Sequence, residues 1–299
     1  MTISKLVSNA ARAEPREYQD FWEGVGKGFP DLGGAASTRY YAQNEQRLFT
    51  DHFPALDGLT ILKTDLWDEA KNTRILLWAG HQGAHVFGID ISEPTVRQAR
   101  AAFNGQPDSR SLHGVAGDVR DIPFKDDSFD AVYSMGTIEH FDATERAVAE
   151  MARVLKPGGR AIIGVPNRHD PFLRPALATV MQWLGLYAYG YEKSYSRRTL
   201  RDMLERAGFI VVTETAILFI PGWLRMLDLA CHAWCRPLSV ITGALVWPFV
   251  QLDARVPALR RHGYLLATVV TKPAQRGPAT SASTSPARKS EPATTMGDP

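Results

Sequence analysis

Two aspartates stand where apolar runs of the chain end: Asp90 closes VFGID, and Asp118 closes VAGD. If both runs are parallel strands of one sheet, the two carboxylates lie together, because such sheets bind ligands beyond the carboxyl ends of their strands. One carboxylate can accept hydrogen bonds from both hydroxyls of a ribose, and the other can accept from the amino group of an adenine. The pair therefore predicts a nucleoside site. The alternative for each residue is a solvated aspartate in a turn.

Glu139 and His140 lie a few residues beyond another apolar run, which ends at Ser134 and Met135. A histidine suits proton abstraction near neutral pH. We expect these two residues to be the catalytic candidates if the chemistry needs a base. The alternative is that they only orient the loop in which they stand.

The rest of the chain supplies the elements that must hold these residues in place. Apolar, β-branched runs alternate with segments whose apolar residues recur at helical intervals. This alternation predicts a mostly parallel sheet covered by helices on both faces. The strand candidates are 59–64, 84–91, 131–134, 160–165, 209–220 and 264–271, with one more before Asp118, and the helix candidates are 17–56, 72–82, 92–104, 142–157 and 197–207. Ser92 and Ser196 are predicted N-caps, and Asp142 with Glu145 has the spacing of a reciprocal cap.

One stretch of the sequence resembles a known family. The run GDVRDIPFKDDSFDAVYSMGTIEHF, followed by RVLKPGG, is similar to the core of class I S-adenosylmethionine-dependent methyltransferases of the small-molecule and lipid-modifying type. The similarity covers roughly residues 59–209 and a last strand near Tyr264. It implies an α/β, doubly wound, Rossmann-like sheet of seven mostly parallel strands, with the last strand antiparallel beside the sixth.

The resemblance also implies a cofactor, S-adenosylmethionine, and the residues that hold it. Asp90 is expected to bind the ribose, and Asp118 is expected to bind the adenine amine, with a backbone N–H from Val119. Further contacts are expected at the ends of the first, second and fourth strands, from Thr64, Asp65, Ile91, Ser134 and Met135. The implied activity is methyl transfer to a small, partly apolar or lipid-like acceptor. The alternative is a catalytically inactive protein of this fold that acts as a scaffold or as a membrane-associated partner.

The first loop departs from the family's pattern. The family has an acidic residue at the end of the first strand and then a glycine-rich turn, whereas this chain has Lys63 and no glycine over residues 62–71. A competing alignment, with 78–83 as a broken glycine loop, leaves no room for the dozen or more residues of a parallel crossover. We therefore expect Asp65 to take over the contact to the cofactor's amino group and Trp67 to form a wall of the pocket. The alternative is a loop that no longer binds the cofactor.

Two apolar segments, 177–191 and 217–250, interrupt the alternating pattern. Charged residues and proline break the second segment, and its longest clean run, 238–250, has thirteen residues, which is too short to span a bilayer. A lid over an apolar pocket, helices buried against the sheet, and a helical hairpin lying on a membrane surface each fit this composition. We predict a bulky, partly apolar acceptor and peripheral membrane contact through residues 219–250.

Composition narrows the class of protein and its surroundings. A formal charge of +2 over 299 residues disfavours a nucleic-acid partner. The two cysteines, Cys231 and Cys235, cannot form a disulfide framework and are a weak metal signal, so we expect a reducing compartment and no metal. No signal peptide is predicted, and a cytoplasmic protein is expected.

We divide the chain into a helical segment (1–56), a methyltransferase domain (57–272, with an apolar insert at about 221–262) and a disordered tail (273–299). The sequence does not indicate an oligomeric state.

Overall fold

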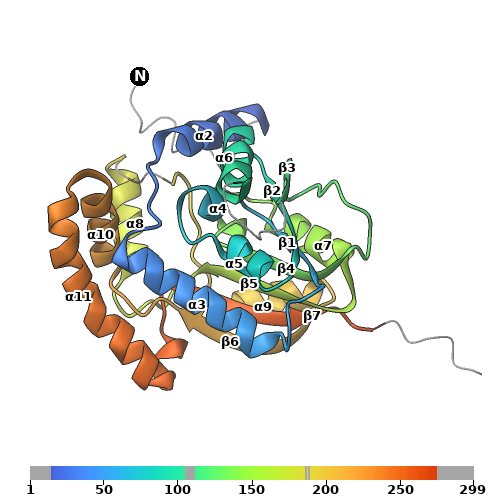
Figure 1. Cartoon of the computed structure of the whole chain (residues 1–299). Helices are drawn as coiled ribbons and strands as arrows, with labels where there is room; N and C mark the ends of the chain where they lie inside the picture. The colour runs from blue at the N-terminus through green and yellow to red at the C-terminus, as the bar shows by residue number, and fades with distance from the viewer. Residues whose placement is uncertain (1–14, 105–111, 186, 188, 275–299) are drawn as a thin grey trace, which may run out of the picture.

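The computed structural model describes residues 15–104, 112–185, 187 and 189–274. In this part of the chain, seven strands form one sheet in the order β3-β2-β1-β4-β5-β7-β6 (Figure 1). Neighbours among β1 to β5 pair in parallel, whereas β7 runs antiparallel to both β5 and β6. The predicted seven-stranded, doubly wound sheet is confirmed, including its antiparallel last strand. The strands are β1 (Thr60–Lys63), β2 (His85–Asp90), β3 (His113–Ala116), β4 (Phe129–Met135), β5 (Leu155–Pro166), β6 (Ile210–Ile217) and β7 (Leu265–Thr271).

The central strands are apolar on both faces because helices cover both sides of the sheet. Ile162 and Ile163 are neighbours in β5 and both are fully buried, yet they belong to two different apolar clusters. One cluster includes Phe49 of α3 (Ala36–His52), and the other includes residues of α7 (Thr144–Val154). Successive side chains of a strand point to opposite faces, so each central strand contributes to two cores.

Two helices that cover the sheet begin at the residues predicted to cap them. Ser92 Oγ accepts a hydrogen bond from the Thr95 N–H at 3.3 Å, and Ser196 Oγ accepts from the Thr199 N–H at 3.1 Å. Both predicted N-caps are therefore confirmed. The remaining helices of these layers are α4 (Trp67–Lys71), α5 (Ile75–His81), α6 (Glu93–Asn104) and α9 (Arg197–Arg206).

One predicted helix forms with shorter bounds, and one predicted cap is wrong. Within 72–82 the chain forms α5, which begins at Ile75 because Arg74 before it adopts a left-handed φ of 55°. The first loop, for which no helix was expected, contains the short helix α4. The predicted reciprocal cap of Asp142 and Glu145 does not form, and α7 begins without a side-chain cap. Asp142 Oδ1 instead lies 2.6 Å from Lys193 Nζ, because the segment after β5 passes close to this loop. Asp142 and Glu145 have the spacing of a reciprocal cap, but Lys193, which is distant in sequence, binds the Asp142 carboxylate instead.

The predicted end of α7 is also wrong. The helix stops at Val154, and the glycines that were expected to close it belong to β5. The Gly158 N–H donates to the Lys272 carbonyl at 2.9 Å, and the Lys272 N–H donates to the Gly159 carbonyl at 3.0 Å. This long-range pairing extends β5 backwards over the Lys-Pro-Gly-Gly run, since a backbone partner is available there.

Four further helices surround the carboxyl edge of the sheet (Figure 1). α2 packs against α6, while α8, α10 and α11 stand together at one end of the molecule. The predicted N-terminal helical segment consists of α2 and α3, which are separated by residues 29–35, including Gly33 and Gly34. Residues 1–14 and 275–299, which include most of the predicted tail, lie outside the described residues. The bounds are α2 (Pro15–Gly28), α8 (Arg174–Trp183), α10 (Gly222–Trp234), α11 (Arg236–Arg255) and the 3-10 helices η1 (Ile138–His140) and η2 (Pro257–Arg261).

Candidate active site

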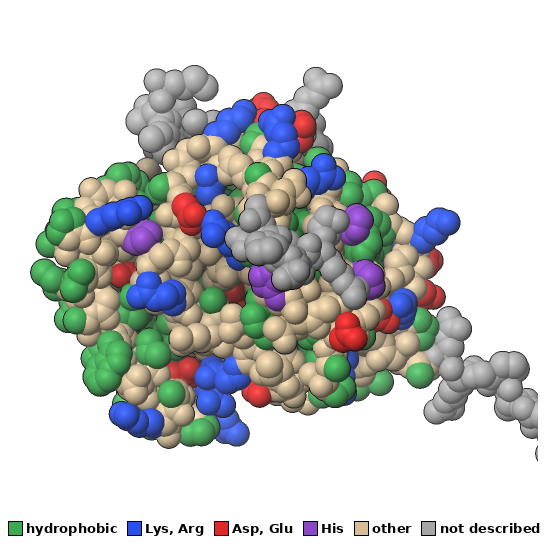
Figure 2. Space-filling view, in the orientation of Figure 1, with side chains coloured by type: hydrophobic (Ala, Val, Ile, Leu, Met, Phe, Trp, Pro, Cys, Tyr) green, Lys and Arg blue, Asp and Glu red, His purple; other side chains and the backbone are tan. Residues whose placement is uncertain are grey.

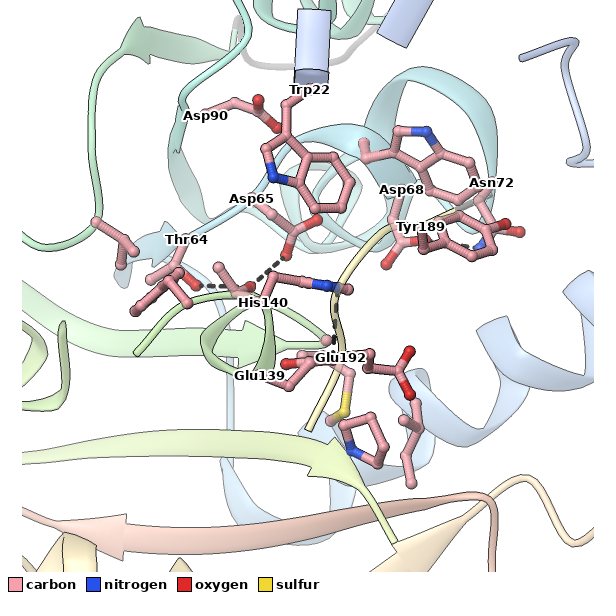
Figure 3. A pocket seen from close by; sticks show the side chains of 18 of the residues that line it. Trp22, Thr64, Asp65, Asp68, Asn72, Asp90, Glu139, His140, Tyr189 and Glu192 are labelled. Atoms are coloured by element: carbon pink, nitrogen blue, oxygen red, sulfur yellow. Dashed lines mark hydrogen bonds and ion pairs between the residues drawn. The ribbon is translucent and has the colours of Figure 1, made fainter. Parts of the chain in front are cut away.

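A cavity of about 1150 Å³, including the space at its mouth, lies at the carboxyl ends of β1, β2, β3 and β4. This position is typical of small-molecule sites in α/β sheets. Trp22, Asp65 and His140 lie around one space in Figure 3, although they come from distant parts of the sequence. All the predicted site residues except Ser134 line the cavity, namely Thr64, Asp65, Asp90, Ile91, Asp118, Val119, Met135, Glu139 and His140.

Ser134 does not reach the cavity. Its side chain is fully buried in β4, between Tyr133 and Met135, which belong to the cluster on the α3 side of the sheet. Because side chains alternate along a strand, Ser134 points to the opposite face. Of the two residues predicted at the end of β4, only Met135 extends to the cavity, and the structure does not support a side-chain contact from Ser134.

Asp90 is held by backbone N–H groups on both sides. Its Oδ2 accepts from the Leu66 N–H and its Oδ1 accepts from the Ser92 N–H, both at 2.8 Å. Each carboxylate oxygen can accept more than one hydrogen bond, so both oxygens retain a lone pair for a ligand hydroxyl. Burial raises the pKa of Asp90 to about 6. Asp90 therefore joins the first loop to the start of α6 and still presents an acceptor to the cavity.

Asp118 is oriented by a neighbouring guanidinium. Arg120 Nε lies 2.9 Å from both carboxylate oxygens of Asp118, and the Arg120 backbone N–H donates to Oδ1 at 2.8 Å. The guanidinium in turn lies over the rings of Tyr18 and Phe141, with distances of 5.3 and 5.1 Å to the ring centres. The carboxylate is therefore fixed at the cavity wall, and a ligand amine would share it with Arg120.

The first loop is built around a buried lysine. Lys63 occupies the position where the family has an acidic residue, and its side chain is fully buried. Its Nζ lies 2.8 Å from Asp65 Oδ1 and 3.7 Å from Asp68 Oδ2, while Asp65 Oδ2 accepts from Thr137 Oγ1 at 3.1 Å. Burial alone would lower the pKa of Lys63, but these carboxylates raise it above its ordinary value, so Lys63 stays charged. Lys63 thus faces two carboxylates, and Arg225, which also lines the cavity, acts on Asp68 as a second cation.

Glycines in the sheet make room for the loop that lacks them. Leu66 is fully buried, and its side chain lies against Gly88 of β2 and Gly114 of β3. A Cβ at Gly88 would lie only 2.2 Å from Leu66 Cδ2, and a Cβ at Gly114 would lie 3.3 Å from Leu66 Cδ1. The bulky turn is therefore accommodated by removing side chains from the neighbouring strands. Because α5 occupies 75–81, the structure also agrees with rejecting 78–83 as the glycine loop.

Glu139 and His140 form η1 at the base of the cavity, and both side chains are buried. His140 Nδ1 lies 2.8 Å from the Tyr191 carbonyl oxygen. A carbonyl can only accept, so Nδ1 carries the hydrogen and the neutral imidazole keeps its lone pair on Nε2. Burial lowers the pKa of His140 and raises the pKa of Glu139 well above its usual range. Burial therefore favours the neutral form of both the histidine and the carboxyl group.

The start of α8 and the segment after it add a polar cluster that was not assigned from the sequence. Arg174 Nη1 lies 2.6 Å from Glu192 Oε1, and the Tyr187 hydroxyl donates to Glu192 Oε2 at 2.5 Å. The Arg174 guanidinium lies 4.2 Å from the ring centre of Tyr264, and all four residues line the cavity. The sequence places Arg174 and Glu192 18 residues apart with no motif, so no local pattern could have indicated their pairing.

The N-terminal helices close the cavity from the other side. Tyr18 and Trp22 of α2 line it, and the Trp22 ring meets the His140 ring edge-on at 4.8 Å between centres. Of two adjacent tyrosines in α3, Tyr41 lines the cavity, whereas the Tyr40 hydroxyl accepts from the Phe219 N–H outside it. Trp67 forms part of the wall, as expected. Aromatic residues interleaved with polar ones in 17–56 were the available signal.

Metal ligation finds no support in the described part of the chain. No group of three or more His, Cys, Asp and Glu side chains there has the arrangement of a metal site. Cys231 is a buried free thiol, and Cys235 is an exposed one.

Comparisons with known proteins agree with the architecture. Residues 70–163 match the family model of a methyltransferase domain. Over 141 residues, 46% of this chain, the sequence is 33% identical to the O-methyltransferase cnsE of Penicillium expansum, and the match covers 49% of that protein. Over 83 residues, 28% of this chain, it is 43% identical to the sterol 24-C-methyltransferase ERG6B of Gibberella zeae, covering 21% of that protein. The chain thus spans about half or less of the length of these relatives.

A solved structure extends the likeness in fold beyond the matched segment. The methyltransferase in a Haloferax volcanii complex with the Trm112 methyltransferase activator superposes with a TM-score of 0.56, at 22% identity, over 88% of this chain and 100% of that one. Identity at that level shows the fold alone. The sequence match adds the family, because it includes the strand ends that carry Asp90 and Asp118. The chain therefore contains a methyltransferase domain of the class I S-adenosylmethionine-dependent family.

Proposed function

We propose that this protein transfers the methyl group of S-adenosylmethionine to a small, partly apolar acceptor. The observation that carries the proposal is the meeting of three acidic residues at one cavity. Asp118, Asp90 and Asp65 follow β3, β2 and β1, which are adjacent in the sheet, and all three line that cavity. Such a row of carboxylates along neighbouring strand ends suits an elongated ligand with an amine at each end and a ribose between them.

The residues present fit that cofactor. Asp90 would accept from the ribose hydroxyls through its free lone pairs, and Asp118 would accept from the adenine amine. The acidic wall at Asp65 and Asp68 would hold the ammonium of the methionine part. Trp67 Nε1 and Glu139 Oε2 are buried polar atoms without a hydrogen-bond partner among the described residues, which is typical of a site whose ligand completes the bonding. When bound, the cofactor supplies an electrophilic methyl group on sulfur.

The chain's own contribution to methyl transfer is alignment and removal of a proton. In-line displacement gains much of its rate from holding the acceptor against the methyl group. His140 is suited to act as the base, because its neutral form carries the lone pair on Nε2 and the Tyr191 carbonyl holds the ring. Glu139 is suited to donate a hydrogen bond instead, since burial raises its pKa and favours its protonated form.

The acceptor side of the cavity is aromatic and aliphatic. Trp22, Tyr189, Met226 and Leu229 line it together with the Arg174–Glu192 pair. An apolar acceptor with one polar group would bury its body against these side chains and place its polar end at the ion pair or at His140. A sterol methyltransferase among the relatives is compatible with this class of acceptor.

Titration calorimetry with S-adenosylhomocysteine tests the proposal. We expect binding by the wild type, and Asp90→Asn should weaken it by about tenfold or more, because hydrogen bonds to a charged group contribute about 1.5–3 kcal/mol. Asp121→Asn is the matched control, since Asp121 is exposed and does not line the cavity. No measurable binding by the wild type, or equal affinities for the wild type and Asp90→Asn, would overturn the assignment.

A second candidate function is a catalytically silent scaffold of the same fold. It is favoured by one observation: two of the three carboxylates already bind cations of the chain, Asp65 to Lys63 and Asp118 to Arg120. A folded protein that binds no S-adenosylhomocysteine would support this function. Formation of S-adenosylhomocysteine from S-adenosylmethionine in the presence of extracted small molecules would exclude it.

A further inference from the structure

One end of the molecule carries a broad apolar surface, which we call the cap face. It is formed by the outer sides of α8, α10 and α11, and Figure 2 shows hydrophobic side chains gathered over α10 and α11. Its most exposed large side chains are Trp183 (82%), Trp234 (77%), Val240 (75%), Trp247 (60%), Ile241 (58%) and Trp223 (55%). Soluble monomers rarely expose contiguous apolar patches of this kind without a partner.

The charges on the cap face have one sign. Within α8, α10 and α11 the two carboxylates, Asp228 and Asp253, are buried at 0% and 3% exposure. Asp228 accepts from the Ser37 N–H and from the Thr242 hydroxyl, both at 2.7 Å. The exposed charges on these three helices are Arg236 and Arg255 at the two ends of α11. The face therefore presents tryptophans and arginines without an exposed carboxylate, which is the composition of surfaces that bind anionic lipid interfaces.

α11 is attached to the protein body along its inner side. It is long and apolar enough to cross a membrane by length and composition, but Thr242, Val246 and Asp253 are buried against the protein. Asp253 Oδ2 lies 3.0 Å from Arg47 Nη2 of α3, and Thr242 bonds to Asp228 of α10. A helix held in this way near both ends can lie in the plane of a membrane surface, whereas spanning it would break these contacts.

We propose that the cap face binds the surface of an anionic lipid bilayer, with the tryptophans in the interface and Arg236 and Arg255 at the headgroups. Met226 connects this surface to the candidate active site, because it is 38% exposed and also lines the cavity. An acceptor dissolved in the bilayer would then reach the cavity past α10. This last step rests on the proposed function, whereas membrane binding itself does not.

Flotation with vesicles tests the proposal in the absence of cofactor and acceptor. We expect the wild type to float with phosphatidylcholine–phosphatidylglycerol vesicles and less with phosphatidylcholine alone. Replacing Trp234 and Trp247 by serine should reduce partitioning by about tenfold or more, since each exposed ring loses a large apolar contact. Replacing Arg236 and Arg255 by glutamine should lower the preference for anionic vesicles by about fivefold each.

The matched control replaces Ile210 and Val212 by serine. These residues are 54% and 47% exposed on β6 and do not belong to the cap face, so flotation should not change. Complete recovery of the wild type in the soluble fraction would overturn the proposal. Dimerisation that is lost with the tryptophan replacements, without flotation, would assign the face to a second copy of this chain. Calorimetry with S-adenosylhomocysteine on the same variants measures cofactor binding separately. A loss of membrane binding can therefore be told apart from a failure of the proposed activity.

Discussion

Replacing Lys63 by methionine should strongly destabilise the fold. Methionine keeps an unbranched apolar stem and removes the ammonium that lies 2.8 Å from Asp65 Oδ1 and 3.7 Å from Asp68 Oδ2. Removing one partner of a buried ion pair costs about 3–5 kcal/mol, because the remaining charge is left buried and uncompensated. The free energy of unfolding of a typical domain is about 5–15 kcal/mol. This single substitution would therefore remove a large part of it.

Equilibrium unfolding in urea measures this cost. Lys27→Met is the matched control, because Lys27 pairs with Glu23 at 3.4 Å on the surface and its side chain is 62% exposed. Surface pairs of this kind contribute at most about 1 kcal/mol. If Lys63→Met also stays within about 1 kcal/mol of the wild type, Lys63 does not hold the first loop together. Should Lys63→Met fail to fold, adding Asp68→Asn should recover the folded state by removing one unpaired charge.

The same variant should respond to acid in a defined direction. Burial raises the pKa of Asp68, and Lys63 opposes that rise. Without Lys63 the carboxyl group in the folded protein keeps its proton at pH values where the unfolded chain has released it. The deficit of Lys63→Met relative to the wild type should therefore shrink as the pH falls below the raised pKa of Asp68, and grow as the pH rises through it. A deficit that does not change as the pH is lowered would contradict an electrostatic cause.

Three further outcomes are expected at the cavity. Burial raises the pKa of Asp90 to about 6, so the affinity for S-adenosylhomocysteine should fall as the pH drops through that value. Calorimetry at several pH values measures this affinity, and a constant affinity would remove Asp90 from the ribose site. Glu192→Gln should lower the free energy of unfolding by about 3–5 kcal/mol, since it leaves the buried guanidinium of Arg174 without its carboxylate. Urea unfolding measures the change. A loss below about 1 kcal/mol would show that the two residues do not form a buried ion pair in solution. Glu139→Gln should leave turnover within about threefold of the wild type, because burial raises the pKa of Glu139 and favours a neutral form that glutamine resembles. A loss of about a hundredfold or more would assign it proton transfer instead.

The parts of the fold that follow local patterns were predictable. Strands and helices alternate because apolar residues recur with the periods of each element, and the positions of Asp90 and Asp118 at strand ends follow from that alternation. The unusual first loop was also visible, since Lys63 and the lack of glycine can be read directly. Two of the predictions that failed concern places where a distant partner competes: Lys272 draws Gly158 and Gly159 into β5, and Lys193 takes the carboxylate of a predicted cap.

The sequence by itself determined the layered sheet, its family and the carboxylates along one edge, because backbone geometry links these features to residues that are near one another in the chain. Three contacts were decided only by the tertiary structure. The Trp22 ring packs edge-on against His140. Arg174 pairs with Glu192 and lies over the ring of Tyr264, and the Leu66 side chain occupies the space that a side chain at Gly88 would fill. These contacts join elements that are separated in sequence, and their geometry depends on how whole helices pack on the sheet. Packing of that kind depends on volume and shape in three dimensions, which a one-dimensional pattern does not contain.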